Sequence, residues 1–154
     1  MTKFSRTATS VLVLLCCGIA VAQDAPVATA PAKTFEDASL KWGPCPSFLP
    51  DGCSIAVLHG DPAQPNADIF FKVPGKSKIA RHWHTSAERM VLVSGELQVT
   101  YDGQKPTVLT PGSYAYGPAK LPHEATCASK APCVLMIAFE SPVDAFPGGG
   151  ATPE

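Results

Sequence analysis

Short apolar runs, separated by turn residues, fill the middle of the chain. Between residues 54 and 139, runs rich in Val, Ile, Leu, Phe and Tyr recur, and many alternate apolar with polar positions. This period of two is that of a β-strand with one buried face. The dipeptides Pro74-Gly75, Ser94-Gly95, Asp102-Gly103 and Pro111-Gly112 between the runs are typical of tight turns. The pattern predicts strands over residues 54–58, 68–73, 79–84, 89–94, 97–101, 107–109, 113–116, 123–127 and 134–139.

Many short strands at regular spacing predict an all-β fold, an antiparallel sandwich or barrel. Residues 99–101, the turn Asp102-Gly103 and the residues from Gln104 onward form a hairpin signal by themselves. No long run has the period of an amphipathic helix, and 16 prolines suit a loop-rich β protein. A length of 154 residues indicates a single domain.

The two ends of the chain differ from this pattern. Residues 1–22 have the features of a secretory signal peptide: Lys3 and Arg6, then the apolar run 11–21, then Ala20-Val21-Ala22 as the cleavage signal. An uncleaved membrane anchor is the alternative, although the run is short for a membrane span. Residues 23–34 read as a flexible Ala/Pro-rich linker, 35–146 as the folded domain and 147–154 as a disordered tail. We therefore expect a secreted or periplasmic protein, with no stable membrane insertion after cleavage.

The charge limits the partners. The formal net charge is −1, and loss of Lys3 and Arg6 with the signal peptide makes it −3. No cluster of basic residues is present that would bind a nucleic acid or an anionic lipid surface. We expect a small-molecule ligand or substrate as the partner.

Four cysteines remain after cleavage: Cys45, Cys53, Cys127 and Cys133. An even number in an oxidising compartment favours disulfides, and four cysteines permit three connectivities. Pairing of sequence neighbours, Cys45 with Cys53 and Cys127 with Cys133, is the favoured pattern. Four buried thiols are the alternative.

Three of the four histidines belong to one arrangement with a glutamate. His82 and His84 are two residues apart on a predicted strand, so their side chains share a face and Trp83 lies on the other. A straight strand would carry Glu88 roughly 13 Å further on, so residues 85–87 must turn the chain for Glu88 to join them. His123 would come from a later hairpin. Imidazole and carboxylate groups together suit a first-row metal ion.

The spacing of these residues resembles a known motif. His82-x-His84-x3-Glu88-x6-Gly95 is similar to the first motif of the cupin superfamily, G(X)5HXH(X)3,4E(X)6G. Gly75 stands one residue further from His82 than that pattern asks.

The second cupin motif, G(X)5PXG(X)2H(X)3N, is matched with two substitutions. Gly112, Pro118 and His123 stand at the motif's positions, whereas Lys120 replaces a glycine and Cys127 replaces an asparagine. Neither substitution affects a metal ligand.

The resemblance implies a single-domain cupin jelly-roll barrel that holds one divalent metal ion. Its ligands would be His82, His84, Glu88 and His123, and the ion would be Fe, Mn, Ni, Cu or Zn. The family also suggests the function: a small-molecule oxidoreductase resembling metal-dependent dioxygenases. A non-catalytic binding or sensing barrel and a metal-dependent lyase or isomerase remain alternatives, as does a structural protein with a vestigial site. A homodimer is a further expectation from the resemblance.

Three tyrosines are candidates for acid–base catalysis. A tyrosine beside a cation loses its proton more readily than a free one, so Tyr101, Tyr114 and Tyr116 are candidate catalytic residues. Ordinary strand packing is the alternative for all three. Met90, Leu92, Leu97 and Val99 are expected to line the barrel and make its interior apolar.

Overall fold

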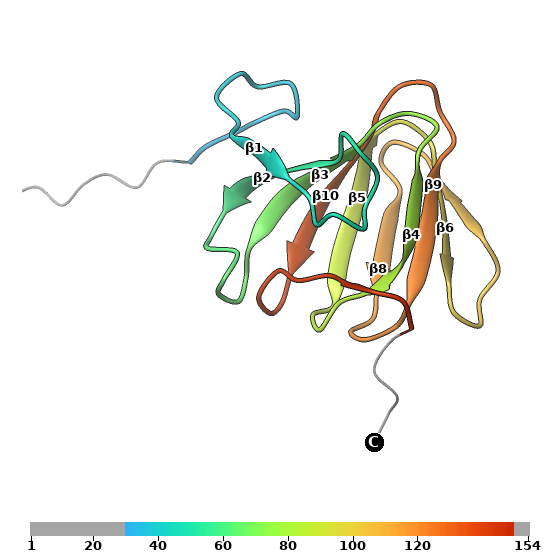
Figure 1. Ribbon diagram of the computed structural model, residues 1–154. Coiled ribbons are helices and arrows are strands. Elements are labelled where there is room, and N and C mark those ends of the chain that lie inside the picture. The colour runs from blue at the N-terminus through green and yellow to red at the C-terminus, as the bar shows by residue number, and fades with distance from the viewer. Residues whose placement is uncertain (1–29, 150–154) are drawn as a thin grey trace, which may run out of the picture. The chain divides into compact units, whose positions relative to one another are not determined.

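The computed structural model describes residues 30–149, and its strands form two antiparallel sheets that face each other (Figure 1). One sheet has six strands in the order β1-β2-β3-β10-β5-β8, and the other has five in the order β11-β4-β9-β6-β7. The first sheet consists of β1 (Trp42–Pro44), β2 (Ser54–His59), β3 (Asp68–Val73), β10 (Cys133–Phe139), β5 (Glu88–Ser94) and β8 (Tyr114–Gly117). The second consists of β11 (Phe146–Pro147), β4 (Lys78–Trp83), β9 (His123–Cys127), β6 (Leu97–Tyr101) and β7 (Thr107–Leu109). The all-β prediction is confirmed.

All nine predicted strands are present, four of them with the predicted bounds: β3, β6, β7 and β9. The structure adds β1 and β11, which the sequence pattern missed. Both are very short and contain a proline, and both lie at the edge of a sheet, where a missing backbone N–H is tolerated. Pro147 in β11 pairs with His82 of β4, although the sequence placed Pro147 in the disordered tail.

The main core lies between the two sheets because alternate side chains of each sheet point inward. On β5, for example, Glu88, Met90 and Leu92 are buried while Arg89 is exposed. Burial of such apolar side chains is the main driving force for folding of this kind of sandwich. The four residues expected to line the barrel are all buried: Met90, Leu92, Leu97 and Val99.

Two disulfides join the cysteines that are neighbours in sequence. Cys45 pairs with Cys53 across a loop before β2, with a Cα–Cα distance of 5.6 Å. Cys127 pairs with Cys133 at a Cα–Cα distance of 5.8 Å and connects the end of β9 to the start of β10. The second disulfide therefore links the two sheets at one end of the barrel.

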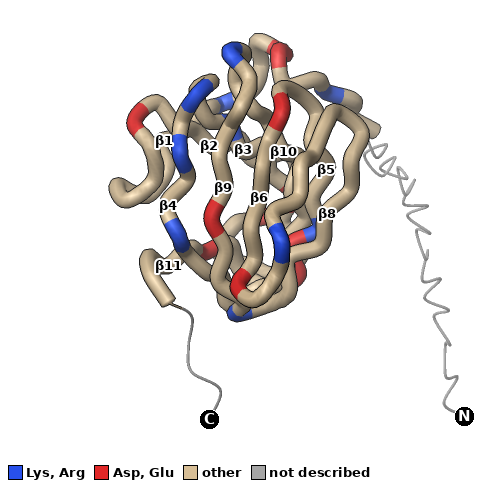
Figure 2. Tube along the Cα trace, turned by 90° about the vertical axis from the view of Figure 1, so that its right-hand side faces the viewer, with Lys and Arg blue, Asp and Glu red and all other residues tan. Residues whose placement is uncertain are grey.

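The surface of the five-stranded sheet carries charges of both signs (Figure 2). Lys78 of β4 lies 3.6 Å from Glu124 of β9, and Arg81 of β4 pairs with Asp102 in the turn after β6. Such exposed pairs add little stability. No helix among residues 30–149 has the length and hydropathy needed to cross a membrane. The predicted signal peptide, residues 1–22, lies outside the described residues.

Candidate metal centre

Three of the four predicted ligands come from two rows of residues that face each other across the barrel, and the fourth, His84, follows directly after β4. In the five-stranded sheet, His82 of β4 is in register with His123 of β9, which is in register with Tyr101 of β6. In the six-stranded sheet, Glu88 of β5 stands between Phe139 of β10 and Gly117 of β8. We call the first set the histidine row and the second the glutamate row.

The chain turns between His84 and Glu88, as the spacing requires. β4 ends at Trp83 and β5 begins at Glu88. His82 and His84 are buried, whereas Trp83 points the other way and stacks on Phe146 with ring centroids 4.7 Å apart. The turn thus moves the chain from one sheet to the other, and this is how a glutamate four residues from His84 reaches the histidines.

The histidines form a compact, buried cluster. Each offers one ring nitrogen to a group in which all three atoms lie within 4.8 Å of one another. The ring centroids of His82 and His123 are 4.3 Å apart, and that of His84 is 4.9 Å from His82 and 5.4 Å from His123. Each histidine is 6 to 8% exposed.

Backbone carbonyls fix which nitrogen of each histidine faces the cluster. Nδ1 of His82 lies 2.7 Å from the carbonyl oxygen of Ala80, and Nδ1 of His123 lies 3.2 Å from that of Leu121. Nδ1 of His84 bonds the carbonyl oxygen of Asp144. A carbonyl oxygen only accepts, so each Nδ1 carries the proton and donates. Each Nε2 is then left with a lone pair, the form in which histidine binds metal ions.

Glu88 lies beside the three histidines. Its Oε1 is 3.3 Å from Nε2 of His84 and its Oε2 is 3.6 Å from Nε2 of His123. Despite the short distance, Nε2 of His84 has no partner with hydrogen-bond geometry and is a buried polar atom left unpaired. Such an atom is costly to bury, and a cation would satisfy it. Three lone pairs and one carboxylate therefore fit a divalent metal ion.

Burial lowers the pKa of two of the three histidines. Burial, with the charge of His84 added, lowers the pKa of His82 to about 4. Burial, with the charges of His82 and His84 added, lowers the pKa of His123 to about 3. Both imidazoles are therefore neutral at pH 7 and ready to bind a cation. The pKa of Glu88 is raised by burial, against the opposing charge of His84.

The structure separates the three candidate tyrosines. Tyr101 is buried, and its ring centroid lies 4.9 Å from that of His123. Tyr114 and Tyr116 on β8 are 60% and 51% exposed, so their side chains point away from the cluster. Of the three, only Tyr101 is brought to the histidines.

The hydroxyl of Tyr101 is a second buried polar atom without a hydrogen-bond partner. A Cβ built on Gly117 would lie 2.9 Å from Tyr101 Oη and 3.1 Å from Glu88 Oε2, so both oxygens border the same small space. Gly117 leaves that space open. Burial and the charge of Glu88 raise the pKa of Tyr101, so the phenol stays protonated at neutral pH and can donate a proton.

The segment after β10 holds the turn between His84 and Glu88. The backbone N–H groups of Glu140 and Ser141 both donate to Oγ of Ser86 at 2.9 Å. The Asp144 carboxylate accepts from the backbone N–H of Thr85 at 2.9 Å and from the Thr85 hydroxyl. With its carbonyl on His84, Asp144 therefore positions this histidine from outside the cluster.

Sequence reasoning did not find Ser86, Asp144 or Gly117. Each acts through its place in the fold. Ser86 and Asp144 each form a hydrogen bond to a partner more than 50 residues away along the chain. Gly117 contributes because it has no side chain to fill the space beside Tyr101 and Glu88. Gly117 lies next to Pro118 of the second motif, the one local signal near it. No signal in the sequence points to Asp144.

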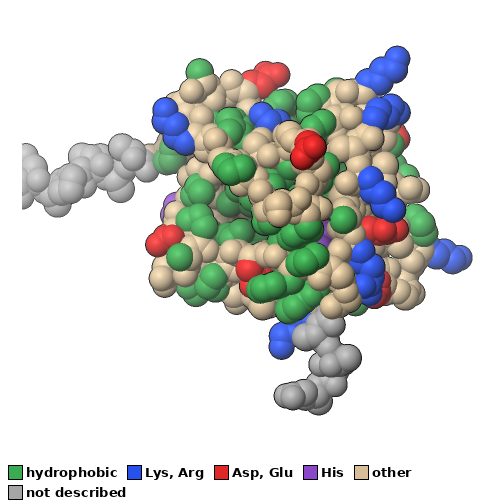
Figure 3. All heavy atoms as spheres, viewed as in Figure 1, with side chains coloured by type: hydrophobic (Ala, Val, Ile, Leu, Met, Phe, Trp, Pro, Cys, Tyr) green, Lys and Arg blue, Asp and Glu red, His purple; other side chains and the backbone are tan. Residues whose placement is uncertain are grey.

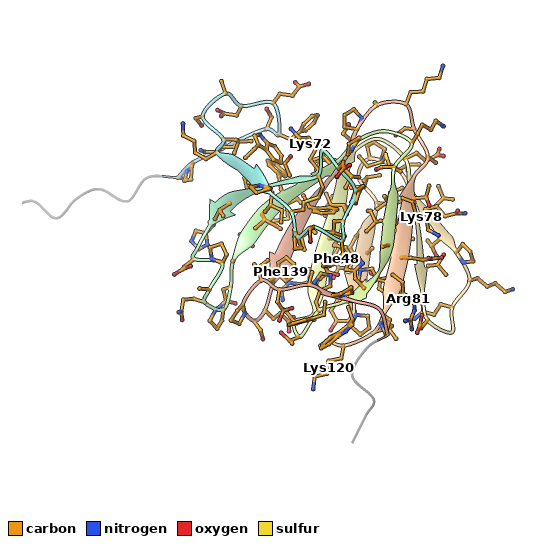
Figure 4. The ribbon with its side chains drawn as sticks, in the orientation of Figure 1. Phe48, Lys72, Lys78, Arg81, Lys120 and Phe139 are labelled. Atoms are coloured by element: carbon orange, nitrogen blue, oxygen red, sulfur yellow. A yellow bond between two sulfur atoms is a disulfide. The ribbon has the colours of Figure 1, made fainter. Side chains whose placement is uncertain are left out.

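An apolar cavity of about 220 Å³ leads to the cluster. Hydrophobic side chains also cover much of the face drawn in Figure 3. Phe48, in the loop closed by Cys45 and Cys53, and Phe139 of β10 lie toward the space between the sheets, whereas Lys78, Arg81 and Lys120 lie at the outside (Figure 4). Phe48 comes close to the site itself, with its ring centroid 6.1 Å from that of His82. Such a cavity, apolar with a few polar groups at one place, is typical of a small-molecule site.

Comparison with known proteins finds one family match and several solved structures of similar fold. The model of the cupin domain matches residues 69–139, which include all four predicted ligands. The DMSP lyase DddQ from Ruegeria pomeroyi DSS-3 is 18% identical, with a TM-score of 0.60 over 70% of this chain and 60% of that chain. A chain from the crystal structures of two further DMSP lyases is 17% identical, with a TM-score of 0.62 over 71% and 62%. An oxalate decarboxylase from Lactobacillus farciminis is 15% identical, with a TM-score of 0.57 over 70% and 33%.

These likenesses concern the fold. The chain spans 60 to 62% of the DMSP lyase chains and a third of the oxalate decarboxylase chain. No curated protein matches the sequence.

Proposed function

The chain belongs to the cupin superfamily, and on that premise we propose that it is a metal-dependent enzyme that acts on a small organic molecule. One observation carries the proposal. Three buried Nε2 lone pairs, each fixed by a carbonyl on the other ring nitrogen, converge with a carboxylate where an apolar cavity ends. Three lone pairs that converge on one buried place would be satisfied by a cation.

His82, His84, His123 and Glu88 would hold one divalent ion. The ion would supply Lewis-acid polarisation of a bound substrate and, if it is redox-active, electrons for chemistry with dioxygen. Fe, Mn, Ni, Cu and Zn all accept such ligands, so the ligand set leaves the metal open. The chain's own contribution is to fix the imidazoles by backbone bonds and to exclude water with apolar walls.

The first candidate reaction is a dioxygenase-type oxidation. The four side chains would hold the ion at the end of the apolar cavity, and the cavity would admit the substrate and dioxygen to it. The apolar walls would protect reactive species from water. A base is needed to take a proton from the substrate. Glu88 has two carboxylate oxygens at the cluster, so one would hold the ion while the other takes the proton.

A metal-dependent lyase or isomerase is the second candidate, and Tyr101 favours it. Its unpaired buried hydroxyl borders the same space as the Glu88 carboxylate, so an acid and a base stand side by side at the cluster. Proton transfer between two carbon positions, or loss of a leaving group, needs such a pair and no oxidant.

Metal analysis tests the foundation of both candidates. Protein from metal-supplemented cultures is expected to carry about one metal ion per chain, and the His84→Ala variant much less. The matched control is His59→Ala, because His59 is exposed at the end of β2. Substoichiometric metal in the parent protein, unchanged by His84→Ala, would remove the proposal.

Turnover with and without dioxygen separates the two reactions. Oxygen uptake with a panel of catechols, β-diketones, flavonols or small thiols supports the dioxygenase reaction. Turnover that persists under argon and falls in Tyr101→Phe supports the lyase or isomerase. A metal-loaded protein that turns over nothing, yet binds ligands tightly, would instead be a binding or sensing barrel.

We also propose that the protein works outside the cytoplasm and as a homodimer. The two disulfides support an oxidising compartment, in line with the predicted signal peptide. Fractionation of cells expressing the full chain tests the location. Sedimentation at micromolar concentration tests the dimer, and a monomer alone would contradict it.

A further inference from the structure

The residues that line the cavity limit which ligands the site can bind. Apart from the three histidines, only Glu88 and Asp144 bring polar side chains to a wall otherwise built from apolar residues. No Lys or Arg of residues 30–149 is among the lining residues. The Asp144 groups are already engaged, its carboxylate by Thr85 and its carbonyl by His84. Polar groups of a ligand can therefore be met at the cluster and nowhere else along the cavity.

The wall away from the cluster comes from both sheets and from loops. Ile55 of β2, Phe71 of β3, Ile79 of β4 and Leu135 of β10 contribute to it, with Leu49 from the disulfide-closed loop. A polar group placed against these side chains would lose its water and gain no hydrogen bond. The body of the ligand must therefore be apolar.

The charge of the site limits the charge of the ligand. A divalent cation beside the ionised Glu88 leaves one net positive charge at the cluster, and one anionic group on the ligand neutralises it. The half-buried Asp144 is a second carboxylate of the lining, and no Lys or Arg among the described lining residues balances it. A second anionic group on the ligand would therefore meet a negative charge and no cation. The cavity of about 220 Å³ is also smaller than the pockets that hold drug-sized molecules.

From these observations we infer that the site takes a small mono-anion with one metal-binding end and an apolar body, such as a short-chain or aromatic monocarboxylate or an enolate. The inference rests on the proposed metal centre. It sets this protein apart from enzymes of extended dicarboxylates, because a second carboxylate at the far end of the ligand would lie against aliphatic side chains.

Titration of the metal-loaded full chain with matched carboxylates tests the inference. Co²⁺ serves as the metal because its absorption reports binding at the ion, and calorimetry gives the affinities. Acetate, butyrate and hexanoate are compared with succinate and adipate. Each methylene buried is expected to raise the affinity about fourfold, the equivalent of about 0.8 kcal/mol. Adipate should bind at least a hundredfold more weakly than hexanoate.

A variant with a cation in the wall should reverse the preference. Ile55 is half-buried on β2 and lines the cavity, so Ile55→Lys is expected to improve adipate binding at least tenfold relative to hexanoate. Val57→Lys is the control, because Val57 lies on the same strand, is exposed and does not line the cavity. If Ile55→Lys fails to fold, Ala145→Lys in the segment after β10 makes the same test.

The outcomes separate this inference from the metal centre. Normal Co²⁺ binding with equal affinities for adipate and hexanoate, or with no gain from acetate to hexanoate, overturns the ligand class and leaves the metal centre standing. Failure to bind Co²⁺ overturns both.

Discussion

The histidine row and the glutamate row contribute differently to the same site. In the histidine row, each imidazole is held by a bond between Nδ1 and a carbonyl, so the ring orientation is set by the backbone. Glu88 in the glutamate row has no such bond and lies 3.3 and 3.6 Å from two of the imidazoles. The histidines are therefore preorganised, whereas the carboxylate takes its place from the opposite sheet through packing. Burial also shifts their pKa values in opposite directions, downward for His82 and His123 and upward for Glu88.

Removing a member of the histidine row should have the largest effect. His123→Ala removes one of the three oriented ring nitrogens and leaves a cavity next to Tyr101. Metal affinity is therefore expected to fall more than a hundredfold, which is more than the loss of a hydrogen bond that only orients a ligand would cause. Competition with a chromophoric chelator measures it. His59→Ala is the control and should change nothing. An unchanged affinity in His123→Ala would show that the row does not bind the metal.

The metal-free protein should lose stability in acid because of the same row. Unfolded histidines have a pKa near 6.5, while the folded pKa values of His82 and His123 are about 4 and about 3. Between these limits the unfolded chain binds protons that the folded chain does not, so the free energy of unfolding falls as the pH falls from 6.5 to about 4. The loss is on the order of a few kcal/mol.

Glu88 acts in the opposite sense and offsets part of this loss. Its folded pKa is raised, so the folded chain takes up this proton at a higher pH than the unfolded chain does. Urea unfolding in the presence of a chelator, from pH 7 to pH 4, measures the net curve. His82→Gln should flatten it and His59→Gln should not; a flat curve in the parent protein would contradict the assignment of the buried neutral histidines.

A change in the glutamate row should weaken the metal site less. Glu88→Gln keeps the shape and removes the charge, so affinity is expected to fall about tenfold to a hundredfold while the stoichiometry stays at one. Calorimetry at pH 7 measures both. Glu140→Gln is the control, because Glu140 is exposed and pairs with Arg89 at the surface. Complete loss of metal in Glu88→Gln would contradict this prediction, because it would show that the carboxylate contributes as much to metal affinity as a histidine does.

Tyr101, at the end of the histidine row, should give the smallest effect. Its hydroxyl is buried without a partner, so Tyr101→Phe removes an unsatisfied group and is expected to raise the stability of the metal-free protein by about 1 kcal/mol. Urea unfolding checks the change. Tyr116→Phe on the exposed face of β8 should stay within about 0.5 kcal/mol of the parent. A clear loss of stability in Tyr101→Phe would mean that the hydroxyl has a partner in solution.

The tyrosines illustrate where local pattern stops being informative. Tyr101, Tyr114 and Tyr116 all lie on predicted strands, and nothing in their neighbours distinguishes them. The distinction came from register: Tyr101 pairs with His123 on β9, whereas Tyr114 and Tyr116 pair with Val91 and Arg89 and face outward. The catalytic role of the tyrosines stays a prediction, and the structure narrows the choice to test first.

The sequence alone determined nine of the eleven strands in the described residues, the turns between them and the composition of the site, because these depend on local periodicity and on residue type. Alternation placed His82 and His84 on one face, and the distance to Glu88 required a turn between them. Tertiary structure alone decided which sheet each ligand comes from and that Asp144 orients His84 across 60 residues of chain. It also decided that no Lys or Arg of residues 30–149 lines the cavity. Contacts of that kind depend on how distant strands pair and pack, and no local pattern of residues encodes them.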